Sequence, residues 1–255
     1  MAITPTTRKA LKRLLVPSDS IHEGQALLEG ADRHYVIDVL RLVVGAQLEL
    51  SDGQGALYEG TIAHVTRRHV GLALGERHEL PPAPGPRLVL LGGMARGGRT
   101  EYVLQKSTEL GVDELCPVIC RRSVSRPKEL SSKHQRYSEV VRQAARQSER
   151  SWLPMLNAPQ KLEDALPRWA SSSATRLVAV PGAPALSSKS ELIKAQEQEI
   201  TLLVGPEGGL CAEEIDLALG VGFQPVGLGT RILRTETAAT ALVAIVAFVS
   251  GRLER

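Results

Sequence analysis

A glycine-rich turn that carries one carboxylate, Gly205-Pro206-Glu207-Gly208-Gly209, combines residue types that can bind a ligand. It follows a short apolar run at 201–204 and precedes the acidic start of a predicted helix at 212–220. Strand, glycine-rich turn and helix in this order are typical of nucleotide-binding sites. This turn departs from the phosphate-binding loop G-x-x-x-x-G-K-[ST], because no lysine follows it to neutralise a triphosphate.

Two further glycine-rich turns follow predicted strands, at 92–99 and at 227–231, and the second runs into 232–237. Neither has the G-x-G-x-x-G spacing of a dinucleotide-binding turn. A carboxylate beside glycines repels phosphate but tolerates a cationic or neutral ligand. With the apolar Leu203, Leu228 and Leu233 nearby, it suits a nucleoside that carries a sulfonium group, such as S-adenosylmethionine. The residues leave open the alternative that these glycines only form tight turns.

An alternation of strands and helices after residue 86 positions these turns. Strands are predicted at 87–93, 113–120, 175–180, 200–204 and 224–229, and helices at 101–111, 132–147, 161–170, 190–199, 212–220 and 235–253. This order predicts an α/β fold with a mostly parallel sheet covered by helices. Ligands of such sheets bind at the carboxyl ends of the strands, which is where the three turns fall.

A proline-rich stretch, 76–86, predicts a linker between two domains. Its four prolines lack backbone donors and disfavour both helix and central strand. Before it, short apolar segments, among them 34–42, and a turn at 51–55 predict a small β-rich domain. The predicted division is therefore 1–75 for this domain, 76–86 for the linker and 87–255 for the α/β domain.

Positive charge gathers in two places, although the whole chain of 255 residues has a net charge of only +3. Residues 121–150 contain nine Lys or Arg against three Glu, and residues 8–13 contain four cations and no acid. Two such clusters favour a polyanion-binding surface, and solvated helix faces are the alternative. Aromatic residues make up only 3%, which argues against binding by bases stacked on exposed rings.

Cysteine, histidine and apolar content restrict the class of protein further. Cys116, Cys120 and Cys211 form no paired framework, which predicts reduced, buried thiols and a cytoplasmic location. The six histidines show no ligand spacing, so no metal site is predicted. The most apolar stretch, 238–249, is shorter than the about 20 residues of a membrane span and predicts a buried helix, not a membrane protein.

Two segments, LLVGPEGGLCAEEID (202–216) and LGTRILRTETAATALVAI (228–245), resemble the C-terminal signature of SPOUT-class methyltransferases. They are most similar to the RsmE family, which methylates N3 of one uridine in 16S ribosomal RNA of the small subunit. Further blocks at 33–62, 105–123 and 142–156 resemble that family in the same order. The resemblance implies a PUA-like β-barrel RNA-binding domain before a SPOUT-type trefoil-knot domain, S-adenosylmethionine as cofactor, and a homodimer.

The resemblance also implies which residues form the site. For catalysis, Arg234 and Arg150 are candidates to stabilise the uridine anion, and Glu236 or Glu207 to accept the N3 proton, with solvent as the alternative base. Arg234 could instead only pair with Glu236 or cap backbone carbonyls, and Glu207 could be a cofactor ligand or a turn anchor rather than a base. The residues carried over as cofactor-binding are Leu203, Val204, Gly205, Glu207, Gly208, Gly209, Leu228, Gly229, Ile232, Leu233, Arg234, Thr237 and Ala238.

RNA contacts are predicted for the basic clusters. The residues are Arg8, Lys9, Lys12, Arg13, Arg121, Arg122, Arg126, Arg142 and Arg146. Two other functions remain compatible with the sequence. One is SPOUT-class methylation of another RNA or base, and the other is a non-catalytic RNA-binding or ribosome assembly factor.

Overall fold

The computed structural model of the chain describes residues 11–124, 130–170, 174–194 and 198–253 and divides the chain into two compact units. The first unit contains the residues up to Pro82 together with Ala145–Leu153. The second contains Ala83–Ala144 and the residues from Pro154 onward. Helix α3 (Leu130–Gln147) therefore begins in the second unit, and its last residues belong to the first.

The first unit is a six-stranded sheet in the order β1-β4-β5-β6-β3-β2. All neighbouring strands are antiparallel except β1 and β4, which are parallel. Its core is aliphatic, with Leu28, Leu48 and Leu50 among its fully buried side chains. The strands are β1 (Arg13–Leu15), β2 (Ile21–His22), β3 (Gln25–Glu29), β4 (Gln47–Ser51), β5 (Ala56–Val65) and β6 (His69–Glu79).

One segment of the first unit is helical, unlike the β-rich prediction that included 34–42. Residues Gly30–His34 form α1 and Tyr35–Val39 continue it as a π-helical turn, η2. Asp38 accepts hydrogen bonds from Arg33 and contacts Nδ1 of His34 at 2.8 Å. A spacing of four residues brings two side chains together in a helix, not in a strand. A short 3-10 turn, η1 (Ser18–Ser20), precedes β2.

The unit boundary also differs from the predicted linker at 76–86. Strand β6 continues to Glu79, and Leu80 N–H still donates to Gly55 O at 2.8 Å. Prolines, which cannot donate, begin only at Pro81, so the strand ends there. The segment 145–153 joins the first unit through backbone hydrogen bonds, including Leu153 N–H to Gly53 O at 2.8 Å.

The second unit contains a parallel sheet in the order β10-β8-β7-β12-β11-β13, with β9 paired to β8. This confirms the predicted α/β alternation. The strands are β7 (Arg87–Gly93), β8 (Glu114–Ile119), β9 (Met155–Leu156), β10 (Gln160–Lys161), β11 (Thr175–Ala179), β12 (Glu199–Val204) and β13 (Gln224–Val226). The helices are α2 (Arg99–Glu109), α3, α4 (Leu162–Ala165), η3 (Leu166–Trp169), η4 (Leu186–Lys189), α5 (Ser190–Lys194), α6 (Ala212–Gly220) and α7 (Thr235–Val249).

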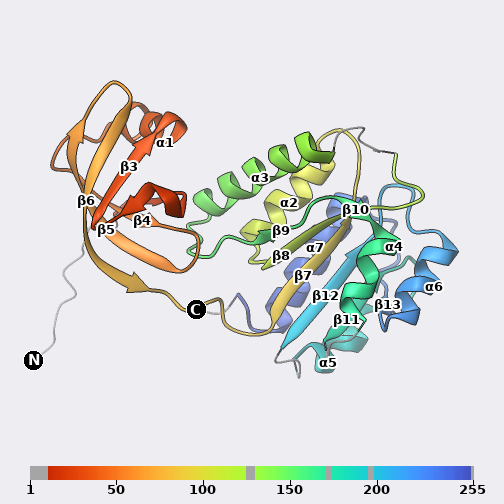
Figure 1. Cartoon of the computed structure of the whole chain (residues 1–255). Helices are drawn as coiled ribbons and strands as arrows, with labels where there is room; N and C mark the ends of the chain where they lie inside the picture. The colour runs from red at the N-terminus through yellow and green to blue at the C-terminus, as the bar shows by residue number, and fades with distance from the viewer. Residues whose placement is uncertain (1–10, 125–129, 171–173, 195–197, 254–255) are drawn as a thin grey trace, which may run out of the picture. The chain divides into compact units, whose positions relative to one another are not determined.

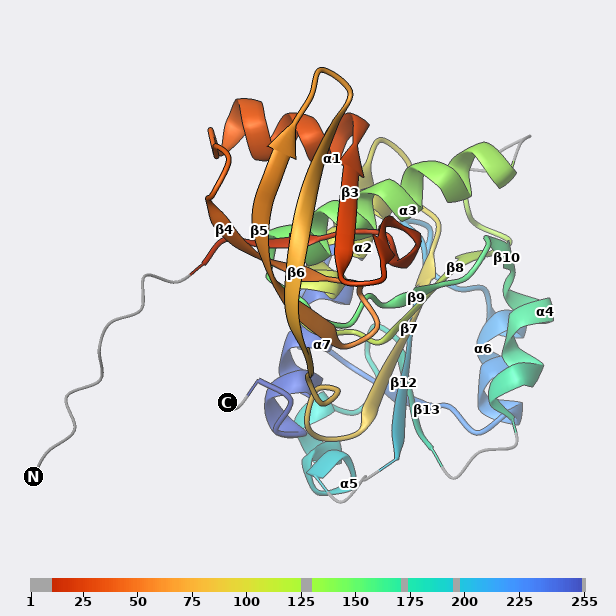
Figure 2. The same ribbon diagram turned by 60° about the vertical axis from the view of Figure 1, so that its left-hand side comes forward.

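Helices cover both faces of this sheet, because its strands are apolar on both sides. Along β7, Leu88 and Leu90 pack against α2 and α7, whereas Val89 and Leu91 pack on the opposite face with residues of α4 and α6. Figures 1 and 2 show α2 and α7 on one face and α4 and α6 on the other. None of the described helices is long and apolar enough to span a membrane; the apolar α7 is instead a core helix, with Leu242 and Val246 fully buried.

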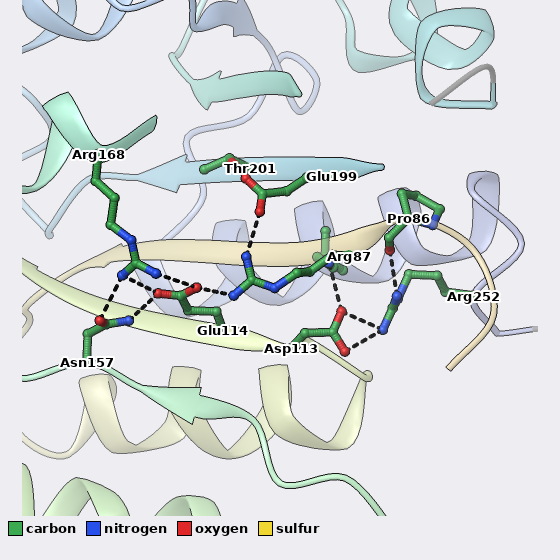
Figure 3. Close-up of polar contacts among 10 residues, drawn as sticks. Pro86, Arg87, Asp113, Glu114, Asn157, Arg168, Glu199, Thr201 and Arg252 are labelled. Atoms are coloured by element: carbon green, nitrogen blue, oxygen red, sulfur yellow. Dashed lines mark hydrogen bonds and ion pairs between the residues drawn. The ribbon is translucent and has the colours of Figure 1, made fainter. Parts of the chain in front are cut away.

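Paired charges close the amino edge of this sheet (Figure 3). The fully buried carboxylate of Glu114, at the start of β8, contacts Arg168 at 2.6 Å, Asn157 at 2.5 Å, and Arg87. Arg87 also binds Glu199 at 2.6 Å, so the first residues of β7, β8 and β12 share one network.

A third arginine, Arg252, lies at the same edge. Its side chain is 2% exposed, and it donates to Pro86 O at 2.5 Å and to Gly111 O at 2.7 Å. It also pairs with Asp113 at 2.8 Å, whose carboxylate accepts the N–H of Leu88 at 2.8 Å. The residues after α7 thus hold the beginning of β7 in place (Figure 3).

Candidate active site

A pocket of about 630 Å³ lies in the second unit, where β11, β12 and β13 end. This is the carboxyl edge at which parallel α/β sheets bind ligands, and the volume is within the about 300–1,000 Å³ of small-molecule sites. Its lining joins the turn after β12, the loop between β13 and α7, and the end of β11. The lining residues are Arg99, Arg122, Ala179, Val180, Pro181, Val204, Gly205, Pro206, Glu207, Gly208, Gly209, Leu210, Ile215, Val226, Leu228, Gly229, Arg231, Ile232, Leu233, Arg234, Thr235, Glu236 and Ala238.

Glycine is required at two places around the 205–209 turn. Gly209 has a φ of +70°, in the left-handed region, and its N–H donates to Pro206 O at 2.8 Å, which closes the turn. Gly93, the last residue of β7, packs against the turn so closely that a Cβ there would lie 2.4 Å from Pro206 N. The ends of two neighbouring strands therefore fix the position of this wall of the pocket.

The carboxylate of Glu207 is held by groups from another segment of the chain. Its Oε1 accepts the backbone N–H of Arg96 at 2.7 Å and Nη1 of Arg99 at 2.8 Å. Burial by itself would raise the pKa of Glu207, but these hydrogen bonds to the ionised form outweigh it and lower the pKa below its ordinary value. Glu207 is therefore an ionised anchor of its turn in this structure, which favours that alternative over a general base.

Arg99 connects this anchor to the first turn of α7. Its Nε lies 3.6 Å from Oε1 of Glu236, while its Nη1 binds Glu207. The other oxygen of Glu236, Oε2, is buried and has no hydrogen-bond partner among the described residues. Buried polar atoms are nearly always paired, so this oxygen is a candidate acceptor for a ligand in the pocket it lines.

The loop before α7 presents side chains at the rim of the pocket. Arg234 occupies the N-cap position of α7 and is exposed, and Ile232 is 91% exposed. Glu236 forms an ion pair with Arg99. No ion pair joins Glu236 to Arg234 among the described residues, so the structure does not support the alternative in which Arg234 only pairs with Glu236. Its guanidinium is available at the rim of a pocket that it helps to line.

Most of the predicted cofactor-binding residues line this one pocket, although they come from two separate segments. Leu203 and Thr237 are the exceptions. Leu203 points to the opposite face of the sheet and is fully buried beside Val89 and Leu91, as the two-residue period of a strand requires. Thr237 is exposed on α7. Contact with a cofactor stays a prediction for the residues that line the pocket.

Arg150, the second arginine predicted to act on the uridine, is not part of the described pocket lining. It belongs to the first unit, where its Nε donates to Trp152 O at 2.9 Å. Its catalytic role therefore has no support from the arrangement of this pocket.

The predicted RNA-binding residues fall into four groups. Arg8, Lys9 and Arg126 lie outside the described residues, while Lys12 is exposed and Arg142 half-buried. Arg13 and Arg146 are engaged inside the first unit, with Glu49 at 2.9 Å and with Asp32 at 2.5 Å respectively.

The fourth group, Arg121 and Arg122, supports the pocket. Arg122 donates to Gly208 O at 3.2 Å, and the N–H of Arg121 donates to Glu214 at 2.7 Å. Glu214 also accepts the N–H of Cys211 at 2.9 Å at the start of α6. These contacts give both arginines a structural task in addition to any contact with RNA.

Sequence reasoning missed Arg99, Arg122 and Arg231 as pocket residues. The glycine-rich turn at 92–99 was a signal, since it follows a strand of the same sheet. No local pattern, however, indicates that Arg99 meets Glu207, which is 108 positions away.

The three cysteines are free and buried as predicted, and burial raises the pKa of Cys116 to about 11.

Comparison with known proteins agrees with this architecture. Residues 82–247 match the family model of an RNA methyltransferase domain, and residues 28–72 match that of an RNA methyltransferase PUA domain. The ribosomal RNA small subunit methyltransferase E of Synechocystis sp. is 34% identical over 239 residues, which cover 91% of this chain and 76% of that protein.

Two solved structures are similar over nearly their whole length. One is a putative methyltransferase from Legionella pneumophila in complex with bound cofactor S-adenosylmethionine, with 28% identity, a TM-score of 0.82, and coverage of 93% of this chain and 97% of that one. The other is the ribosomal RNA small subunit methyltransferase E of Neisseria gonorrhoeae bound to S-adenosylmethionine, with 28% identity, a TM-score of 0.80, and coverage of 94% and 98%.

The fold and the carboxyl-edge pocket thus define a class, an RNA methyltransferase of SPOUT type with a PUA-like domain before its α/β domain. Within that class, the sequence identity to the Synechocystis protein and the coverage of both chains show the family. The chain belongs to the ribosomal RNA small subunit methyltransferase E family, as the RsmE resemblance predicted. The trefoil knot stays a prediction.

Proposed function

We propose that this chain is an S-adenosylmethionine-dependent methyltransferase that methylates N3 of a uridine in 16S ribosomal RNA. The observation that carries the proposal is the pocket at the carboxyl edge, where glycine turns, two carboxylates and an exposed arginine meet. The two similar structures hold S-adenosylmethionine, and the one from Neisseria gonorrhoeae is a ribosomal RNA small subunit methyltransferase E, the family to which this chain belongs.

The described residues fit this cofactor. Gly205, Gly208 and Gly229 let a ligand approach the backbone closely, and Leu228 and Ile215 offer apolar walls. Among the described residues of the lining, the carboxylates of Glu207 and Glu236 offset part of the positive charge of four arginines, Arg99, Arg122, Arg231 and Arg234. When bound, the cofactor supplies a methyl group on a sulfonium: the N3–carbon bond forms as the carbon–sulfur bond breaks, and the N3 proton leaves.

Arg234 and Glu236 are the residues that act on the uridine. Loss of the N3 proton leaves negative charge on O2 and O4, and the exposed guanidinium of Arg234 stabilises that charge. Oε2 of Glu236, which is buried and has no hydrogen-bond partner in the described part of the chain, accepts the proton, which then passes to solvent. Both side chains line the pocket and belong to neighbouring positions at the start of α7.

The rest of the proposal concerns the setting of the reaction. The PUA-like first unit and the basic residues bind the small-subunit RNA by its backbone and shape, and the protein works in the cytoplasm. The enzyme is a homodimer, for which α7 offers apolar side chains on its outer face: Phe248 is 69% exposed and Ile245 is 43% exposed.

Calorimetry with S-adenosylmethionine, followed by mass-spectrometric mapping of 16S ribosomal RNA, tests the proposal. Small subunits from a strain that lacks this gene should gain one N3-methyluridine when incubated with the purified protein and the cofactor. Absence of cofactor binding would reject a methyltransferase. Methylation of another base, or of transfer RNA only, would reject the substrate while keeping the enzyme class.

A further inference from the structure

We propose that Arg99 is a positioning residue for the cofactor pocket. Its guanidinium holds Glu207 and Glu236 together and thereby sets the distance between the 205–209 turn and the start of α7. The inference rests on the proposed function, because its measured quantity is the affinity for S-adenosylmethionine.

The geometry joins three segments that are distant along the chain. Nη1 of Arg99 lies 2.8 Å from Oε1 of Glu207, and its Nε lies 3.6 Å from Oε1 of Glu236. Arg99 itself begins α2, directly after the turn whose Arg96 N–H also binds Glu207. A planar guanidinium can serve two carboxylates in fixed directions, which a lysine ammonium cannot do with the same precision.

Exposure indicates that this contact shapes the pocket and does not build the core. The side chain of Arg99 is 40% exposed, while those of Glu207 and Glu236 are 25% and 19% exposed. The apolar cores on both faces of the sheet do not include any of the three. Loss of the guanidinium should therefore loosen the pocket wall while the unit stays folded.

The charge of Arg99 and its contacts with the two carboxylates predict opposite effects on cofactor affinity when the residue is replaced. Arg99 is a cation that lines a pocket proposed to bind a sulfonium, so its charge alone opposes the cofactor. Removal of that charge would then strengthen cofactor binding. If Arg99 instead holds the two carboxylates in place, its removal weakens binding in spite of the favourable change in charge. The sign of the effect distinguishes the two roles.

The experiment compares Arg99→Gln and Arg99→Lys with Arg96→Gln. Arg96 is a matched control, because it lies in the same turn, is exposed and binds Glu207 only through its backbone N–H. Calorimetry should show a Kd for S-adenosylmethionine raised about ten-fold in Arg99→Gln and several-fold in Arg99→Lys, which keeps the charge but not the fork. Arg96→Gln should match the wild type.

Two further readouts separate positioning from a general loss of structure. The Tm of each variant without cofactor should stay close to that of the wild type, and KM for the RNA should not change. In a Glu207→Gln background, Arg99→Gln should add much less than it does alone, because one of its two partners is already lost.

Several results would overturn the assignment. Unchanged or tighter cofactor binding in Arg99→Gln would mean that Arg99 contributes only charge. Weakening that occurs only with an equal loss of Tm would make its role structural, and additive effects with Glu207→Gln would exclude the proposed link. Failure of the wild-type protein to bind S-adenosylmethionine would instead reject the proposed function itself.

Discussion

The two edges of the parallel sheet use the same charged residue types in opposite ways. At the amino edge, Glu114 is fully buried between arginines. Arg252 is buried there with three oxygen-bearing partners for its terminal nitrogens, although its Nε has no partner among the described residues. At the carboxyl edge, Arg234 is exposed and Glu236 keeps a buried oxygen with no partner among the described residues. Charges that are satisfied within the chain stabilise the fold, whereas charges left open are available to a ligand.

The sharpest test of this contrast is Arg234→Ala at the carboxyl edge. Loss of a donor to a developing oxyanion typically costs about 10²–10³ in kcat, so we expect a fall of that size. Because the side chain is exposed, the Tm should change little. Methyl transfer to small subunits from a strain lacking the gene, measured at saturating cofactor, checks the fall.

Arg231→Ala is the matched control for this test, since Arg231 is an exposed arginine of the same loop and lines the same pocket. It should lower kcat far less. Equal losses in the two variants would mean that only the local positive charge matters and that Arg234 has no special position.

The opposite behaviour is expected for Arg252→Ala at the amino edge. It removes the guanidinium that donates to Pro86 O, Gly111 O and the Asp113 carboxylate, which should lower the free energy of unfolding by about 2–4 kcal/mol. Urea unfolding measures this loss, and the Kd for cofactor of the folded variant should equal that of the wild type. Lys161→Ala, which removes an exposed cation with one partner at 3.5 Å, should have almost no effect.

A change of pH tests the carboxyl edge through the carboxylate of Glu207, and we expect a smaller effect than from the substitutions above. Glu207 faces the guanidinium of Arg99 and the N–H groups of Arg96 and its own backbone, and Glu236 lies beyond Arg99. The pKa of Glu207 is lowered from the ordinary 4.5. The contribution of ionised Glu207 to the stability of the pocket is therefore fully present above pH 4.5, and it is lost as the pH falls through the lowered pKa. Because Glu207 stays ionised between about pH 7 and 5, its titration should not change the cofactor affinity in this range.

The variants give this pH dependence its control. In Arg99→Gln the pKa of Glu207 should rise, so that affinity begins to fall at a higher pH than in the wild type. Glu207→Gln has no carboxylate to titrate and should lose that step. Identical pH profiles for Arg99→Gln and the wild type would contradict the link between Arg99 and Glu207.

The smallest effect is expected for Thr237→Ala. The resemblance carried Thr237 over as cofactor-binding, but its side chain is exposed and lies outside the pocket lining. Surface substitutions of this kind usually change free energies by no more than about 0.5 kcal/mol, so Kd should stay within about two-fold. A larger loss, measured by calorimetry, would restore the prediction made from the sequence.

Local patterns explain what could be predicted from the sequence. The glycine turn at 205–209 and the segment 228–238 are continuous stretches, and both line the pocket. The alternation of strands and helices likewise depends on neighbouring residues, and it predicted the parallel sheet. The side chain of Leu203 does not line the pocket, whereas that of the next residue, Val204, does, as the two-residue period of a strand indicates, and a cofactor contact of Leu203 stays a prediction.

Contacts between distant residues explain what could not be predicted. Arg99 meets Glu207 across 108 positions, and neither residue carries a local sign of the other. The segment 145–153, including Arg150, continues from a helix of the second unit but belongs to the first unit through backbone bonds to a turn about a hundred residues earlier. The helix at 30–39 was missed because its apolar residues do not distinguish helix from strand without the Asp38 contacts.

The contact of Arg252 with Pro86 has a consequence for how the protein is made. On the ribosome, Pro86 is synthesised 166 positions before the arginine that holds it, and β7 follows directly after Pro86. The amino edge of the sheet thus stays unsealed until almost the whole second unit has been translated, whereas the sheet of the first unit, β1 to β6, is complete once Glu79 has emerged. The contacts of Arg252 with Pro86, Gly111 and Asp113 can therefore form only after synthesis of α7 has ended.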